Sequence, residues 1–175
     1  MKTRNGSPGV RMFKVGDKVV YPMHGAGIIK AIEEKEILGE QDQYYVMFLP
    51  IGEMKVMIPV DGVDVGLRPV IDKDELESVL DVLRAGRTRM SSNWNRRYRA
   101  NTEKLKTGDI YEVAEVVRNL TLRHEEKGLS TGERKMLDNS RQILVSELVL
   151  ILSATTEEVE QMIDEALKRD QDEST

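Results

Sequence analysis

The chain lacks cysteine altogether and has only two histidines and one tryptophan among its 175 residues. Without cysteine it can form neither a disulfide nor a thiolate metal site, which fits the reducing cytoplasm where we expect the protein to act. His24 has no carboxylates nearby at the spacing of metal ligands. The sequence therefore predicts no metal site and no cofactor, and it favours a structural role for His24.

Long apolar runs are also absent. The longest run, from about Ile143 to Leu152, is interrupted by Ser146 and Glu147, so it falls short of the roughly 18 residues of a membrane span. No arrangement of serine and histidine is typical of nucleophilic catalysis, and clusters of glutamates are most simply solvated faces. We therefore expect neither a membrane protein nor an enzyme.

The two ends of the chain look unlike the rest. Residues 1–11, MKTRNGSPGVR, are polar and precede a second methionine, Met12. We interpret them as a leader or tag, with a native arm as the open alternative. Residues 169–175 are polar and terminal, and we expect a disordered tail there.

Hydrophobic periodicity divides the remaining chain into two predicted domains, an α+β layout. In residues 12–68, short apolar runs broken by glycine and proline predict a small β-barrel of about five strands. Residues 69–71 form the predicted linker. Residues 72–168 carry apolar positions at i, i+3, i+4 and i+7, and this spacing predicts a domain of about five helices. The expected helix starts follow capping residues: Asp72, Asn93, Asp109, Ser130 (a capping box with Glu133) and Thr155.

The stretch from Arg84 to Lys106 concentrates positive charge on an otherwise acidic chain. It carries eight lysines and arginines against one acid, Glu103, whereas the whole chain has a formal net charge of −5. It also contains Trp94. Such a patch indicates a surface that meets a polyanion, and the aromatic residue suggests contact with bases as well as phosphates.

A helix over this stretch places Trp94, Arg97 and Tyr98 on one face, and Arg96 and Arg99 on another. The neighbours of Trp94 are almost all polar, which favours an exposed ring that acts as an apolar wedge in a DNA minor groove. Flanking arginines would then neutralise phosphates. The alternatives are a solvated, arginine-rich helix and a tryptophan that belongs to the core.

The β domain offers a second candidate surface. The predicted strand Lys55–Ile58 ends at Pro59, and because proline cannot donate a ladder hydrogen bond, this strand suits a sheet edge. An unpaired edge can accept a strand from another protein. The alternative, that the helical domain covers this edge, stays open.

Several segments, taken in order, resemble the CarD/CdnL family of bacterial transcription regulators. They are FKVGDKVVYPMHGAGII (13–29), ILGEQ (37–41), NWNRRYRANTEKLKTGD (93–109), VAEVVRNL (113–120) and GLSTGERKMLDNSRQILVSEL (128–148). The resemblance implies a Tudor-like N-terminal barrel that binds the β-subunit lobe of RNA polymerase by extending a β-sheet, as in the transcription-repair coupling factor. It also implies a helical domain that contacts promoter DNA at the upstream edge of the −10 element.

The resemblance and the basic stretch together give the predicted site residues. The expected DNA contacts are Trp94, which the family uses as a minor-groove wedge, and Arg96, Arg97, Arg99, Arg87, Arg89 and Lys104. The expected polymerase contacts are Lys35, Lys55, Val56, Met57, Ile58 and Pro59. Some family members have arginine at the position of Met57; the apolar residue here keeps backbone pairing possible but supplies no charged side chain.

The function predicted from the sequence is that of a monomeric transcription regulator that binds RNA polymerase and promoter DNA and stabilises the open promoter complex. Two alternatives remain at this point. One is a protein-interaction adaptor whose basic patch meets an acidic protein. The other is an autonomous architectural DNA-binding protein that makes no polymerase contact.

Overall fold

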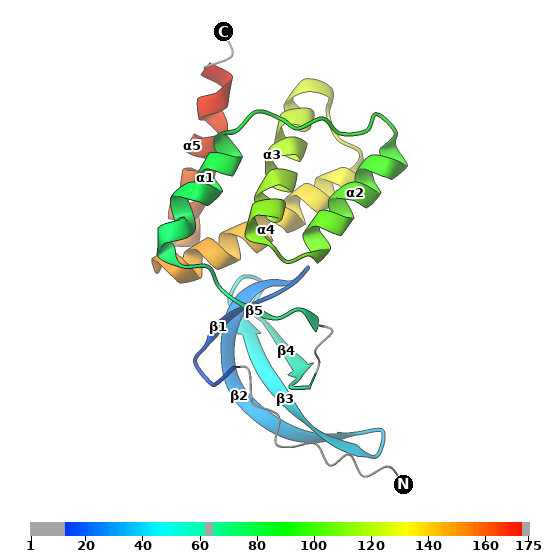
Figure 1. Cartoon of the computed structure of the whole chain (residues 1–175), viewed down its shortest axis with the longest axis vertical. Helices are drawn as coiled ribbons and strands as arrows, with labels where there is room; N and C mark the ends of the chain where they lie inside the picture. The colour runs from blue at the N-terminus through cyan, green and yellow to red at the C-terminus, as the bar shows by residue number, and fades with distance from the viewer. Residues whose placement is uncertain (1–12, 62–64, 173–175) are drawn as a thin grey trace.

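The computed structural model describes residues 13–61 and 65–172, with side chains up to residue 168. The predicted leader, residues 1–11, lies outside the described residues. A β domain forms one end of the molecule and a helical domain forms the other (Figure 1). The predicted α+β layout of two domains is confirmed.

The β domain is a curved, antiparallel five-stranded sheet in the order β4-β3-β2-β1-β5 (Figure 1). Its interior packs side chains from alternate positions, since successive residues of a strand point to opposite faces; they include Val19, Ile29, Tyr45, Met47 and Ile58. The strands are β1 (Lys18–Tyr21), β2 (Gly25–Ile37), β3 (Glu40–Leu49), β4 (Met54–Pro59) and β5 (Arg68–Pro69). Within the described residues β4 pairs only with β3, so the predicted edge strand is confirmed.

The helical domain contains five α-helices, as the apolar spacing predicted. A short 3-10 helix, η2 (Lys73–Glu75), precedes α1 (Leu76–Arg84), and then follow α2 (Trp94–Lys106), α3 (Ile110–Lys127), α4 (Thr131–Leu152) and α5 (Thr156–Asp172). The Asn93 side chain accepts a hydrogen bond from the backbone N–H of Arg96 at 3.1 Å, and Asp109 caps α3 in the same way through Tyr111. These caps satisfy backbone donors that the first helical turn leaves unpaired.

The two domains are held together by polar contacts from α4. Ser146 Oγ accepts a hydrogen bond from the backbone N–H of Ala26 at 2.8 Å. Arg68 makes a bidentate ion pair with the buried Glu147, at 2.8 and 2.7 Å, and its Nε donates to the carbonyl of Gly108 at 2.8 Å. Glu147 also accepts from the backbone N–H of Ile71. Of the predicted linker, residues 69–71, Ile71 is thus anchored to the helical domain, whereas Pro69 pairs with Val19 in the sheet and the N–H of Val70 donates to the carbonyl of Lys18.

No helix within the described ranges is long and apolar enough to cross a membrane.

Candidate nucleic-acid interface

Trp94 is the first residue of α2, and its ring is partly exposed, at 44%. One face of the ring stacks on Tyr98, one turn further along, with ring centroids 5.4 Å apart and planes at 21°. The indole Nε1 donates a hydrogen bond to Ser130 Oγ at 2.9 Å. The expectation of an exposed ring is confirmed: Trp94 lies on the surface in one defined orientation and is not a core residue.

The partner of the indole lies at the start of another helix. Ser130 is the N-cap of α4 and also accepts from the backbone N–H of Glu133 at 3.3 Å. Gly132, in the first turn of α4, lies so near that a Cβ there would meet Trp94 Cζ2 at 3.7 Å. The capping pattern identifies Ser130 as a helix start, but nothing in the sequence indicates that the starts of α2 and α4 meet. Ser130 was therefore missed as part of this site.

A buried ion pair joins Arg97 of α2 to Glu133 in the first turn of α4, and the two side chains are only 3% and 2% exposed. Arg97 Nε and Nη2 donate to the two carboxylate oxygens at 2.8 and 2.9 Å. Its Nη1 donates to the carbonyls of Ser91 and Ser92, in the loop before α2. Arg97 thus connects this loop to the first turn of α4.

The ion pair also sets the charge state of both groups. The hydrogen bond from Arg97 lowers the pKa of Glu133 below its usual range, against the opposing effect of burial. The same hydrogen bond raises the pKa of Arg97. The prediction that Arg97 contacts DNA directly therefore does not fit this structure, because a buried guanidinium that is already paired with a carboxylate cannot reach a phosphate.

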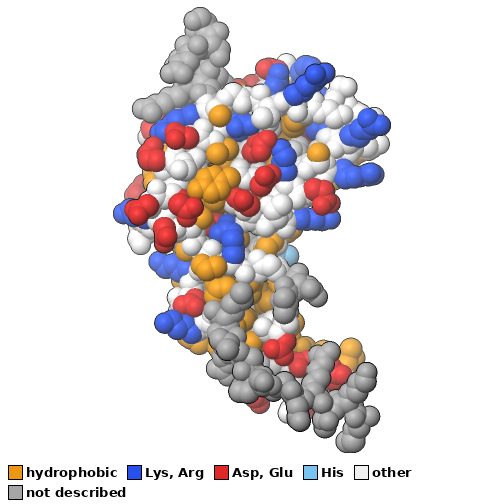
Figure 2. Space-filling model, in the orientation of Figure 1, with side chains coloured by type: hydrophobic (Ala, Val, Ile, Leu, Met, Phe, Trp, Pro, Cys, Tyr) orange, Lys and Arg blue, Asp and Glu red, His pale blue; other side chains and the backbone are white. Residues whose placement is uncertain are grey.

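The other predicted cations fall into two groups. Arg87 pairs with Glu126 and Lys104 pairs with Glu115, the latter at 2.8 Å. By contrast, the exposed residues Arg89, Arg96 and Arg99 form no ion pair with any described residue. Basic side chains gather along the margin of the helical domain over α2 (Figure 2).

Hydrogen bonds to α3 anchor the loop that carries Arg87 and Arg89. The backbone N–H of Thr88 donates to Asn119 Oδ1 at 3.2 Å, and Asn119 Nδ2 donates back to Thr88 Oγ1 at 2.7 Å. Asn119 is fully buried. The loop is thereby positioned on the helical domain, and the sequence pattern gave no sign of this buried amide.

On the β domain, the register of β4 separates the predicted polymerase contacts into two sets. Ile58 is buried in the interior, Val56 packs against the same core, and they pair with Tyr45 and Met47 of β3. Ile58 can therefore offer a partner only backbone groups, and the partly exposed Val56 has its side chain engaged with the core. An isolated change such as Val56→Glu would disturb the fold itself.

Lys55 and Met57 alternate with those inward residues and so belong to the outer face of the sheet. Lys55 lies opposite Phe48 in the register, and Met57 lies opposite Val46. Lys30, Val46, Phe48 and Lys55 together line a shallow apolar hollow beside the edge strand. Lys35 lies further along β2, opposite Asp42 of β3.

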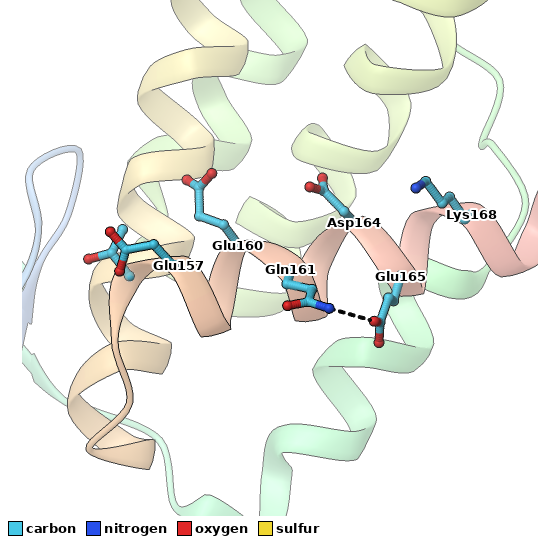
Figure 3. Close-up of a pocket in the computed structure, with 7 residues that line it drawn as sticks. Glu157, Glu160, Gln161, Asp164, Glu165 and Lys168 are labelled. Carbon is cyan, nitrogen blue, oxygen red and sulfur yellow. Dashed lines mark hydrogen bonds between the residues drawn. The ribbon is translucent and has the colours of Figure 1, made fainter.

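A separate hollow runs along α5 and is lined mainly by acidic side chains (Figure 3). Gln161 Nε2 donates to Glu165 Oε1 at 3.3 Å, and Asp164 pairs with Arg141 of α4 at 2.7 Å. Within the described residues, no group of three or more histidine, aspartate or glutamate side chains could hold a metal ion. This face gives no support to a second chemical site.

Comparison with known proteins matches both halves of the chain. Residues 13–71 match the family model described as the CarD-like/TRCF RID domain, and residues 78–164 match that of the CarD C-terminal domain. A curated protein of Bacillus subtilis (strain 168) named "Putative transcription factor YdeB" is 47% identical over 149 residues, which are 85% of this chain and 97% of that protein. The chain therefore belongs to the CarD family of transcription factors.

Proposed function

We propose that this protein binds the β-subunit lobe of RNA polymerase through its β domain and promoter DNA through Trp94, and so stabilises the open promoter complex. The observation that carries the proposal is the half-exposed Trp94 ring, held by Tyr98 and Ser130 at the junction of α2 and α4. An apolar ring presented in this way beside arginines suits the distorted minor groove at the upstream edge of the −10 bubble.

Preorganisation makes the wedge effective. Stacking and the indole hydrogen bond fix the ring before DNA arrives, so binding costs little further side-chain entropy. By analogy with contacts between bases and aromatic side chains, the ring contributes on the order of 1–3 kcal/mol. This corresponds to a lifetime of the open complex about tenfold to a hundredfold longer.

The phosphate contacts of this proposal are Arg89, Arg96 and Arg99. Arg97 acts indirectly, because its ion pair with Glu133 supports the first turn of α4 on which the ring rests. The ion pairs of Arg87 and Lys104 leave a small positive surface. A positive surface this small favours a DNA contact made while the protein is tethered to RNA polymerase. It disfavours the alternative of an autonomous DNA-binding protein.

The tether in this account is the free edge of β4. Its outward backbone groups can extend a sheet of the polymerase, while Lys55 and Met57 contribute side chains on the outer face. The contact of Arg68 with Glu147 and Gly108 joins the β domain to α4 and to the turn that follows α2. Binding at one end would therefore place Trp94 at a defined position and high effective concentration.

The experiment that tests this function is a competitor challenge of open complexes formed by the polymerase of the source organism. The proposal expects complexes with the protein to outlive those without it. Equal lifetimes, with the protein shown to be folded, would overturn the proposal and return the adaptor alternative to first place.

A further inference from the structure

The loop between α1 and α2, residues 85–93, forms no helix or strand and crosses over α3 on its way (Figure 1). Such a connection ordinarily runs over the surface and is more mobile than the elements that it joins. This loop is instead held by polar side chains from inside the helical domain. Eight polar or charged residues are buried in the described part of the chain: Arg97, Asn101, Arg118, Asn119, Glu133, Ser140, Ser146 and Glu147. The first four of them contact this loop.

Thr88 is held through both its backbone and its side chain. Besides the hydrogen bonds with Asn119 described above, its hydroxyl accepts a hydrogen bond from Arg118 Nη2 at 3.1 Å and donates one to Glu115 Oε1 at 2.8 Å. A hydroxyl has one donor and two acceptor positions, so all three positions of Thr88 Oγ1 are filled. A polar network whose members are all satisfied makes the local structure rigid.

Further contacts hold the second half of the loop. Asn101 Nδ2 donates to Met90 Sδ at 3.6 Å, and Arg97 Nη1 donates to two carbonyls of the loop at 3.1 and 3.3 Å. Arg97 also pairs with Glu133 in the first turn of α4. The loop is therefore attached to the same helix start to which the indole of Trp94 is bound.

Between these contacts the loop displays positive charge. Arg87 and Arg89 are exposed on either side of Thr88, and the sequence has no acidic residue over positions 84–102. Arg87 is paired with Glu126, but Arg89 forms no ion pair with a described residue. An exposed guanidinium without a carboxylate partner suits an anion, and in a protein that meets DNA this anion is a backbone phosphate.

We propose that the loop of residues 85–93 is a preformed phosphate-binding element, in which Thr88 is a positioning residue that sets the place of Arg89 on the DNA backbone. The network behind Thr88 fixes the loop before DNA arrives, so the contact costs less conformational entropy. The inference rests on the proposed function and deepens it, because it assigns a phosphate contact to a loop outside the helix that carries Trp94. Phosphate contacts of this kind fix the register and orientation of a protein on DNA.

The test measures how the affinity of this protein for a polymerase–promoter complex depends on salt, relative to its affinity for polymerase alone. Thr88→Val keeps the branched shape but removes the hydroxyl. We expect binding to weaken about tenfold and the slope of log affinity against log salt to fall by about 1. The melting temperature should fall by a few degrees, since Asn119 and Arg118 each lose an acceptor. Thr88→Ser keeps the hydroxyl and should restore affinity and slope.

Two comparisons separate positioning from general damage to the fold. Thr102→Val, on α2, loses a hydroxyl that donates to the carbonyl of Tyr98, and this matched control should keep the wild-type slope. Arg89→Ala should give the same reduced slope as Thr88→Val. Combining these two substitutions should lower the slope no further, because Thr88 acts only through Arg89.

The outcomes separate the inference from the function on which it rests. A reduced slope that Thr88→Ser restores, and that the double variant does not lower further, supports the inference. A wild-type slope for Thr88→Val or for Arg89→Ala, or a further loss in the double variant, overturns it while the proposed function stands. If the wild type binds polymerase equally well with and without promoter DNA at every salt concentration, the proposed function and this inference fail together.

Discussion

The indole of Trp94 donates a hydrogen bond to the hydroxyl of Ser130, which lies 36 residues further along the chain. That hydroxyl also caps α4, so the side chain proposed to meet DNA is attached to the frame of the helical domain. The ring is exposed but its orientation is fixed by contacts on two sides, from Tyr98 and from Ser130. A wedge needs both properties, because it must reach a base step and must not fold back on the protein.

The buried position of Arg97 leads to the first prediction. Arg97→Met leaves the Glu133 carboxylate buried without its partner, and we expect the free energy of unfolding to fall by about 3–5 kcal/mol. Arg99→Ala, at an exposed arginine two residues away, should leave it nearly unchanged. Urea-induced unfolding of the wild type and both variants measures these free energies. Equal, small losses would mean that Arg97 is not the structural residue described above.

The pKa of Glu133 gives a prediction about pH. Because the ion pair lowers this pKa in the folded state, the stability that it contributes is present above the ordinary pKa of glutamate, about 4.3. That stability is lost as the pH falls through this value towards the lowered pKa of the folded state.

Unfolding measured from neutral to acid pH should therefore show wild type losing its advantage over Glu133→Gln as the pH falls. The other carboxylates titrate in both proteins, so their effects on the free energy of unfolding cancel in the difference. A difference in the free energy of unfolding that stays constant across the whole pH range would contradict a lowered pKa of Glu133.

The phosphate contacts predict a change in salt dependence. In complexes of polymerase with promoter DNA, Arg96→Ala and Arg99→Ala should each weaken binding of this protein and lower the slope of log affinity against log salt by about 1. Lys168→Ala, on the exposed side of α5, is a control for lost positive charge and should keep the wild-type slope. An unchanged slope in the two arginine variants would exclude them as phosphate contacts.

Much of this arrangement follows from the sequence, for reasons that are local. The capping residues Asn93, Asp109 and Ser130 begin helices because their side chains satisfy donors only two or three residues away. The exposure of Trp94 followed from its polar neighbours, and the edge position of β4 was predicted from Pro59. These features depend on short stretches of chain, so one sequence can reveal them.

The features that could not be predicted from the sequence depend on contacts between residues that lie far apart in the chain. Charge alone cannot tell which of the arginines meets Glu133, so Arg97 was placed with the DNA contacts when it belongs to the interior. Val56 and Ile58 were grouped with Lys55 and Met57, although strand alternation separates them once the register with β3 is known. The pairing of Glu147 with Arg68 depends in the same way on how two domains meet.

The measurement that tests the central claim most directly is the lifetime of the open promoter complex with wild-type protein, with Trp94→Ala and with Trp94→Phe. The account predicts that alanine shortens the lifetime about tenfold to a hundredfold, towards that without the protein. Phenylalanine, which keeps a ring but loses the bond to Ser130, should retain part of the effect. An alanine variant that is folded, binds polymerase and supports the full wild-type lifetime would contradict the account.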